Sequence, residues 1–545
     1  MNADPRSTKS RHLALAPALG LLLLATSQPA RARGPQVFAL TEVRIVVAPG
    51  RQIEKGTVVL RDGIIEAVGA EITPPADARI LERPKLTVYP GLIDAYVEAA
   101  WPVRNVDDAR DGAHENPLVR PERRMALHGI AAAAAEKLRA AGFTTVAVAP
   151  REGLFRGHSA VVNLGDGGVN ENLLRAEHAQ NVTFARNARG GGYPGSLMGS
   201  IALFRQTLLD ARWHARAWAA YDANPAQTRP EMNTAYAELE SVVSGTGLVV
   251  IVGSKALDTL RNASLVREFG LRAHLVGSGD EYRWLDEISA LGIPLIVPVD
   301  FPDVPEVPEQ DEDDDLAVTL DELRHWDSAP KNPKALIDAG NTVALTSHRL
   351  EDPRDILKNL YIAIDQGGLS AGEALAALTT TPARLLGIED RAGTVEIGKM
   401  ANLVLVEGEL FAEEPRVREV WIDGRRFEIK DSNPAAIEPA GTWELEVTTQ
   451  GGETILATLI LEGEATSLSG TISDPAGNPI PLARAVVSGV RLEITFDGTA
   501  YGMPGDVEFF LDIEGDSGSG DGTSPDGAFT IKATRSIGPP EVVTR

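Results

Sequence analysis

The chain of 545 residues contains no cysteine. It therefore has no disulfide scaffold, no thiolate zinc site and no cysteine nucleophile. Aromatic residues make up only 5% of the chain, and positive charge is in deficit, since the formal net charge is −25. This acidic balance argues against a nucleic-acid partner and against binding to an anionic membrane surface. The composition, with 43% hydrophobic and 24% charged residues, is typical of a globular protein, and the length allows two or more domains.

Long apolar runs are also scarce, apart from one near the N-terminus. Three basic residues (Arg6, Lys9 and Arg11) precede the apolar residues 13–25, and Ala30-Arg31-Ala32 fits a small-x-small cleavage site. This order predicts a signal peptide over residues 1–32, with a buried N-terminal helix as the other interpretation. No cysteine follows for lipid attachment, so we expect the processed protein in the periplasm or outside the cell, free of the membrane.

The stretch after Pro90 and Gly91 carries the densest chemical signal. Asp94, Tyr96 and Glu98 follow at period-two spacing in an otherwise apolar run. On a strand, these three side chains share one face. Polar groups on one face of a short apolar strand need wet or reactive surroundings, and the end of a barrel strand provides them.

Residues 90–94, with the sequence Pro-Gly-Leu-Ile-Asp, resemble the first barrel strand of the amidohydrolase superfamily, in its imidazolonepropionase-related branch. Residues 378–387 and 393–404 resemble the same superfamily at the exit from the barrel. The resemblance covers about residues 37–430. It implies a (β/α)8 barrel, hydrolysis of a non-peptide carbon–nitrogen bond and a catalytic divalent metal. In this branch His-x-His follows the Asp, whereas this chain has Tyr96 and Glu98 there.

The other positions where the resemblance implies metal ligands or a catalytic acid also differ. Gly253-Ser254 follows the apolar run 248–252, and Gly277-Ser278-Gly279 follows the run 271–276, where relatives place histidines. His348 stands where relatives have the catalytic Asp. We therefore expect no metal ligands of the family type and no bound cofactor. His274, within the run 271–276, is either a core histidine or a site residue.

A metal-free pair is the remaining candidate for chemistry. Glu98 and His348 would be neighbours at the ends of the first and last strands of a closed barrel. They are candidate catalytic residues, a general base and its orienting partner, or else a salt bridge that fills the space of a metal. Tyr96, Asp94 and His158 are candidate binding residues, since His158 enters a strand through a glycine turn and could line the barrel mouth.

Two functions stay open. One is the hydrolysis that the resemblance implies. The other is a catalytically silent barrel that binds a small molecule or partners an active relative, and a homo-oligomer is compatible with both. The acidic run 309–315 is expected to be a solvated loop, although a cation site is conceivable.

Strand and helix patterns predict an α/β fold class with three parts. Residues 91–387 alternate strands and helices, as in a (β/α)8 barrel, with seven clear strands and the eighth expected within 170–184. Residues 33–90 and 388–436 are β-rich and are expected to form one composite β-sandwich. Residues 441–545 show short alternating strands with turn residues between them, which predicts a C-terminal antiparallel β domain. Such a module could stabilise the chain or bind carbohydrate, a partner or a lipocalin-type ligand.

Overall fold

The computed structural model describes residues 37–101, 114–184, 192–305, 318–429, 437–449, 454–463, 468–473, 478–501, 506–524 and 527–537. The predicted signal peptide, its cleavage site and the acidic run 309–315 lie outside these residues. Over the described ranges, every helix is too short or too polar to span a lipid bilayer.

Segments from both sides of the barrel form one mixed sheet of eight strands, in the order β18-β17-β16-β5-β1-β2-β3, with β4 paired to β1. The strands are β1 (Val37–Ala48), β2 (Arg51–Arg61), β3 (Ile64–Gly69), β4 (Arg79–Glu82), β5 (Leu86–Pro90), β16 (Leu403–Glu407), β17 (Arg416–Ile422) and β18 (Arg425–Glu428). The link between the two halves is the antiparallel pairing of β5 with β16. The sharing of one sheet by the two β-rich segments, expected from the sequence, is therefore present.

This sheet curls over its own apolar face. Phe38 on β1 and Trp421 on β17 are three strands apart in the sheet order, yet their ring centroids are 5.1 Å apart. In a flat sheet, three strand spacings would separate them by roughly 14 Å. Trp421 is fully buried in the core that results, together with Leu40 and Ile45. The expected sandwich is thus one rolled sheet that encloses a shared core.

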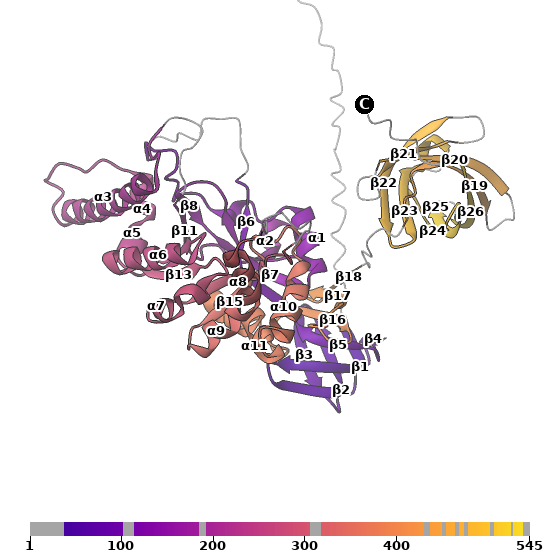
Figure 1. Cartoon of the computed structure of the whole chain (residues 1–545), viewed down its shortest axis with the longest axis horizontal. Coiled ribbons are helices and arrows are strands. Elements are labelled where there is room, and N and C mark those ends of the chain that lie inside the picture. Colours follow the sequence, from indigo (N-terminus) through magenta and orange to yellow (C-terminus); the bar gives the residue numbers. More distant parts are fainter. Residues whose placement is uncertain are drawn as a thin grey trace, which may run out of the picture.

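The middle of the chain forms a TIM-barrel-like arrangement of mostly parallel strands (Figure 1). Its strands are β6 (Leu92–Ala99), β7 (Phe143–Pro150), β8 (Phe155–His158), β9 (Ala160–Asn163), β10 (Leu173–Arg175), β11 (Gln180–Thr183), β12 (Leu248–Val252), β13 (Arg272–Val276), β14 (Leu295–Pro298) and β15 (Val343–Thr346). They form two sheets, β10-β9-β7-β6 and β15-β14-β13-β12-β11-β8. β11 lies within the region where the eighth strand was expected, and it pairs in parallel with β12.

The barrel departs from a regular (β/α)8 repeat at β8 and β9. These two short strands, separated only by Ser159, run antiparallel to β11 and β7 respectively. The remaining strands from β11 to β15 are parallel to one another, and β6 is parallel to β7. The regular repeat expected from the sequence is therefore not seen across the residues that the structure describes.

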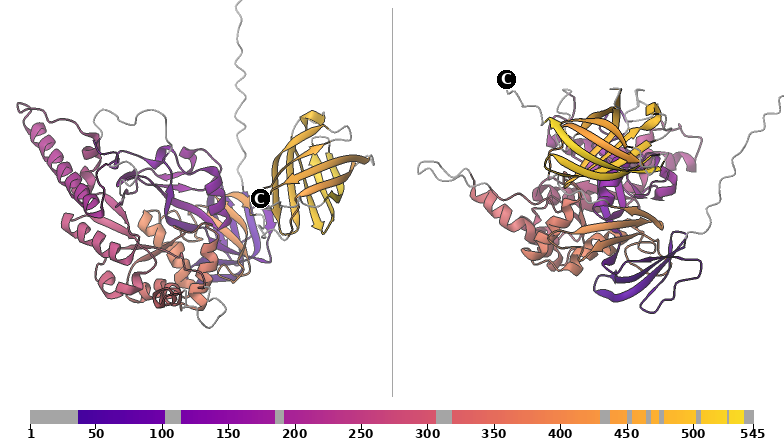
Figure 2. Two further views of the ribbon diagram at one scale, coloured as in Figure 1. Left: turned by 45° about the horizontal axis from the view of Figure 1, so that its top comes forward. Right: turned by 90° about the vertical axis from the view of Figure 1, so that its right-hand side faces the viewer.

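Helices pack around the strands of this barrel, as the two further views show (Figure 2). They are α1 (Ala132–Ala140), α2 (Val169–Asn172), α3 (Leu197–Ala223), α4 (Thr234–Glu238), α5 (Glu240–Val243), α6 (Ala256–Phe269), α7 (Leu285–Ser289), α8 (Leu320–Ser328), α9 (Asn332–Asp338), α10 (Asp355–Asp365), α11 (Ala371–Leu378) and α12 (Thr380–Leu386). Alternation along the strands separates two cores: Val249 and Ile251 pack toward the helices, whereas Val250 and Val276 face the barrel interior.

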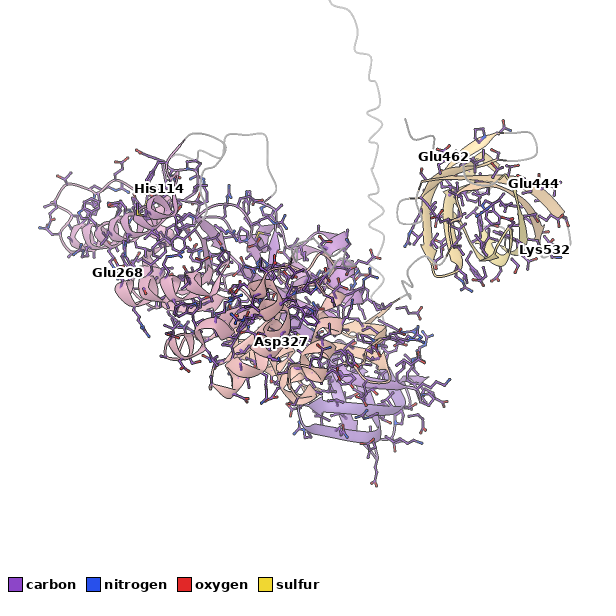
Figure 3. The ribbon with its side chains drawn as sticks, viewed as in Figure 1. His114, Glu268, Asp327, Glu444, Glu462 and Lys532 are labelled. Atoms are coloured by element: carbon purple, nitrogen blue, oxygen red, sulfur yellow. The ribbon has the colours of Figure 1, made fainter. Side chains whose placement is uncertain are left out.

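The C-terminal strands form a closed antiparallel barrel in sequence order. They are β19 (Gly441–Thr449), β20 (Thr454–Glu462), β21 (Ser469–Ser473), β22 (Pro479–Ser488), β23 (Arg491–Asp497), β24 (Asp506–Glu514), β25 (Ser517–Ser524) and β26 (Gly527–Ile537). Trp443 and Leu445 are buried in its core, whereas Glu444, between them in sequence, is exposed and labelled on this barrel in Figure 3. Apolar side chains fill the interior, and the buried residues of that core all lie in strands of this barrel. A filled interior argues against lipocalin-type ligand storage.

Candidate functional site

The polar face of β6 meets a buried arginine at the carboxyl end of the barrel. The Tyr96 hydroxyl donates a hydrogen bond to Glu98 Oε1 at 2.8 Å. Arg156 Nη1, from β8, donates to the same Glu98 oxygen at 2.6 Å and to the Tyr96 hydroxyl oxygen at 3.0 Å. The side chains of Arg156 and Glu98 are only 8% and 15% exposed, so little water screens this ion pair.

The electrostatics fix the protonation of this cluster. Burial alone would raise the pKa of Glu98, but the charge and hydrogen bond of Arg156, with His348 and Tyr96, bring that pKa below its ordinary value. Burial raises the pKa of Tyr96 well above that of a free phenol. Glu98 is therefore an ionised acceptor at neutral pH, and Tyr96 a neutral donor to it.

Asp94 joins the first barrel strand to the last. It is fully buried and accepts hydrogen bonds from Ser347 N at 2.9 Å, from Ser347 Oγ at 2.7 Å and from Tyr96 N at 3.0 Å. Thr346 Oγ1 donates to the Tyr96 carbonyl at 2.8 Å and adds to this connection. Burial raises the pKa of Asp94, although the bonds from Thr346 and Ser347 oppose that shift. The carboxylate oxygens of Asp94 thus link the first barrel strand to the residue that follows the last one.

His348 lies beside this cluster, as the sequence predicted from its place after the last strand. Its half-buried ring stands edge-on to the ring of Tyr96, with centroids 5.1 Å apart and an interplanar angle of 89°. Burial lowers the pKa of His348, while the nearby Glu98 charge opposes this. The Glu98 carboxylate hydrogen-bonds to Tyr96 and Arg156 rather than to the imidazole, so a base–orienter pair is not preformed.

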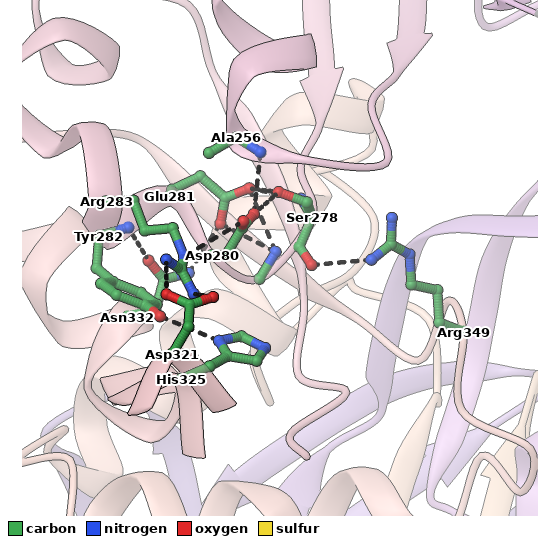
Figure 4. Close-up of polar contacts among 11 residues, drawn as sticks. Ala256, Ser278, Asp280, Glu281, Tyr282, Arg283, Asp321, His325, Asn332 and Arg349 are labelled. Atoms are coloured by element: carbon green, nitrogen blue, oxygen red, sulfur yellow. Dashed lines mark hydrogen bonds and ion pairs between the residues drawn. The ribbon is translucent and has the colours of Figure 1, made fainter. Parts of the chain in front are cut away.

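The rim after β13 is occupied by a second buried carboxylate (Figure 4). Glu281 is completely buried and accepts hydrogen bonds from Gly279 N at 3.1 Å and from Asn332 Nδ2 at 2.8 Å. A Cβ placed on Gly277 would lie 2.4 Å from Glu281 Oε1. The residue after β13 therefore has to be glycine while Glu281 holds this position, and a histidine ligand has no room.

Hydrogen bonds from Arg349 connect the ends of three strands at the same rim. From the turn after β15, its Nη1 donates to the Ser278 carbonyl at 2.9 Å and its Nη2 to the Gly253 carbonyl at 3.2 Å. Ser278 and Gly253 follow β13 and β12, the two positions where the resemblance implied histidines. A fixed guanidinium therefore lies among the strand ends that would surround a metal.

The side chains at this end do not fit a catalytic metal. Within the ranges that the structure describes, no three His, Asp or Glu side chains are arranged to hold a metal ion. Asp94 is already bonded to Ser347, and Glu98 to Tyr96 and Arg156. A guanidinium in direct contact with Glu98 would also repel a divalent cation. Catalytic zinc sites use three protein ligands, which these residues do not offer.

The structure brings together Asp94, Tyr96, Glu98 and His348, but it does not bring His158 to them. Because β8 runs antiparallel to its barrel neighbour β11, it descends from Arg156 toward the amino end, where His158 pairs with Gln180, the first residue of β11. His158 therefore lies at the amino-terminal end of the strands, where it lines a cavity, and its role in binding stays a prediction. Arg156 is the residue of β8 that reaches the mouth, and the sequence analysis missed it.

His274 is a buried residue of the barrel wall rather than a member of this cluster. It lies in β13, and its ring is 6.4 Å from that of His178. Burial, with the nearby Arg272 charge, lowers the pKa of His274 to about 4. It is therefore neutral at physiological pH.

Comparison with known proteins finds a partial family match and a likeness of fold. Residues 344–427 match a family model described as the amidohydrolase family. Of solved structures, an amidohydrolase from Thermotoga maritima MSB8 shares 21% identity with a TM-score of 0.59, over 72% of this chain and 100% of that one. Another amidohydrolase shares 14% identity (TM-score 0.43; 72% and 100% covered), and a molinate hydrolase shares 13% (TM-score 0.42; 72% and 95% covered). At 21% identity, the likeness to the Thermotoga maritima structure is one of fold. No curated protein sequence matches the chain.

Proposed function

We propose that this chain is a catalytically silent member of the amidohydrolase superfamily that acts by binding a small molecule. The family-model match over residues 344–427 and the likeness of fold to the Thermotoga maritima amidohydrolase support the superfamily. The contact between Arg156 and Glu98 carries this proposal. Metal-dependent hydrolysis of a carbon–nitrogen bond requires a water whose pKa is lowered by a bound metal. Here a guanidinium supplies the positive charge beside Glu98, and a guanidinium activates no water in that way.

The rest of the rim supports the same proposal. Glu281 fills the space beside Gly277, and Arg349 spans the ends of β12 and β13. These side chains form hydrogen bonds at the rim, whereas a metal site would need free ligand atoms there. The rival hypothesis is a working hydrolase of non-peptide carbon–nitrogen bonds, which would need Glu98 and His348 to separate from their present partners.

Metal content distinguishes these two functions. We expect the purified full-length protein to hold far less than one equivalent of zinc, manganese or iron by elemental analysis, even after incubation with each metal and desalting. Near-stoichiometric metal that disappears in Glu98→Ala or His348→Ala, but persists in the control Glu462→Ala, would return the protein to the working hydrolases. Glu462 is an exposed carboxylate of the C-terminal barrel, so it controls for general loss of acidic charge.

We also propose that the protein is exported. The basic start, the apolar core and Ala30-Arg31-Ala32 support this proposal. N-terminal sequencing of protein from its native compartment is expected to begin at Arg33, and a sequence that begins at Met1 would contradict export. The proposed ligand is a small molecule rather than a nucleic acid, and the protein could act alone, as a homo-oligomer or in complex with a related barrel.

A further inference from the structure

A cavity of about 200 Å³ opens at the amino-terminal end of the barrel strands. Gln180, Leu248 and Arg272, the first residues of β11, β12 and β13, contribute to its wall. Tyr96 and Glu98 lie at the other end, near the carboxyl ends of the strands. The cavity is much larger than the space that one water molecule needs, so it has room for a small organic molecule.

Positive charge dominates this cavity. Arg175, Arg272 and Arg384 line it, one each from β10, β13 and α12. Its one acidic lining residue, Glu177, accepts a hydrogen bond from Arg124 Nε at 2.7 Å, and Arg124 also pairs with Glu238. The three lining arginines therefore outnumber the single lining carboxylate. Among the described residues, neither Arg272 nor Arg384 has a carboxylate partner. In a chain with a net charge of −25, this local excess of cations selects for an anion.

Buried polar atoms in the cavity wall lack partners among the described residues. His178 is 6% exposed, and both its ring nitrogens are without a hydrogen bond. Gln180 donates its Nε2 to the Pro121 carbonyl at 2.7 Å, but its Oε1 is unpaired. An unsatisfied buried polar group costs about 1–3 kcal/mol, so this arrangement favours a polar occupant. Burial, with His274, Arg175 and Arg272, lowers the pKa of His178 to about 3, so its neutral ring offers one donor and one acceptor.

We propose that this cavity binds a small organic oxyanion, with a carboxylate or phosphate head and a hydroxyl or amine group beside it. The arginines at the mouth match the head, since guanidinium groups bind carboxylate and phosphate oxygens through paired N–H donors. The His178 N–H donates to an oxygen further in, and Gln180 Oε1 accepts from the neighbouring hydroxyl or amine. This site goes beyond the silent carboxyl end, because it places a binding function at the end of the barrel where conserved residues ordinarily serve stability.

Calorimetric titration of the full chain with malate and with glycerol 3-phosphate tests the site. We expect saturable binding of at least one probe, weakened at least about tenfold in Arg272→Gln/Arg384→Gln. Both arginines are exposed, so this variant is expected to fold. Arg79→Gln, which removes an exposed arginine of β4, is the matched control and is expected to bind like the unmodified protein. Binding of malate alone identifies a carboxylate site, and binding of glycerol 3-phosphate alone a phosphate site.

Two further measurements separate this site from the carboxyl end. Ring resonances of His178 are expected to shift on probe binding in the unmodified protein and to stay in place in Arg272→Gln/Arg384→Gln. Arg151→Met, which removes an exposed arginine 3.8 Å from Glu98 at the opposite end, is expected to leave probe affinity unchanged, whatever the metal content shows about hydrolysis. Absence of saturable binding, equal weakening by Arg79→Gln, or loss of binding in Arg151→Met would each overturn the proposed oxyanion site.

Discussion

Replacement of Arg156 by methionine is expected to reduce the free energy of unfolding of the TIM-like barrel by about 3–5 kcal/mol. The substitution keeps an unbranched side chain in the wall but leaves the carboxylate of Glu98 buried without its cation. Arg156 Nη1 also donates to the Tyr96 hydroxyl, so that bond is lost as well. Equilibrium urea unfolding of the full chain, followed through the transition of the helical part by circular dichroism, measures the loss.

The effect of Arg156→Met on the free energy of unfolding is expected to depend on pH. In the unmodified protein the folded pKa of Glu98 is lowered, so its stabilisation is present above its unfolded pKa and is lost as pH falls through the folded value. Without Arg156, burial raises the folded pKa, and stability is lost as pH rises above the unfolded value. The difference in unfolding free energy between the two proteins should therefore shrink as pH falls below the usual range of a glutamate.

Arg151 provides a matched control for the same carboxylate. Its Nε is 3.8 Å from Glu98 Oε2, but its side chain is 60% exposed. An exposed pair contributes about 0–1 kcal/mol, so Arg151→Met should change stability little. The double variant Glu98→Gln/Arg156→Met should recover much of the loss, because it leaves no buried charge unpaired. Equal effects of Arg151→Met and Arg156→Met would contradict the buried ion pair and remove the main support for a silent site.

Local sequence was sufficient to predict one side of this site. Asp94, Tyr96 and Glu98 were predicted because strand alternation and the preceding Pro90-Gly91 are encoded within ten residues. His348 was identified through the resemblance, which places it at the end of the last barrel strand, and closure of a barrel brings that strand beside the first. The shared sheet of the flanking segments was predictable for the same reason, since neither segment can bury its apolar face alone.

Arg156 was not predictable, because its role depends on the direction of β8. A positive φ of 108° at Gly157, and a Cβ that would lie 2.4 Å from the Arg123 carbonyl oxygen there, show how closely this strand meets a neighbouring loop. Nothing in the four residues of β8 distinguishes an antiparallel strand from a parallel one. The reversed strand therefore puts Arg156 beside Glu98 at the carboxyl end, and His158 in the wall of the cavity at the amino end.

The amino-terminal cavity was beyond sequence analysis for a different reason. Arg175, Arg272 and Arg384 are far apart in the chain, and each is an ordinary exposed arginine in its own segment. His178 is of interest only because it is buried without a partner, which depends on tertiary packing. Sites that are built from single residues of several elements leave no spacing pattern to detect.

Truncation of Trp443 to alanine is expected to destabilise the C-terminal barrel by about 3–5 kcal/mol. Its side chain is completely buried in a core whose buried residues all lie in strands of this barrel. Its Nε1 donates to the Pro439 carbonyl at 2.8 Å, and the Arg535 guanidinium lies 4.5 Å from the ring centroid. The substitution therefore removes a large apolar volume, a hydrogen bond and a cation–π contact together.

The number of thermal transitions that this loss of stability moves tests whether residues from 441 onward fold as a separate unit. If they do, calorimetry of Trp443→Ala should show one transition moved to lower temperature while the transition of the TIM-like barrel stays in place, because the two cores share no residues. Leu456→Ala is the control, since Leu456 lies in β20 of the same barrel with 58% of its surface exposed, and it should move neither transition appreciably. A single transition that moves as a whole in Trp443→Ala would contradict the separate unit, because it would mean that the C-terminal barrel and the rest of the chain unfold cooperatively.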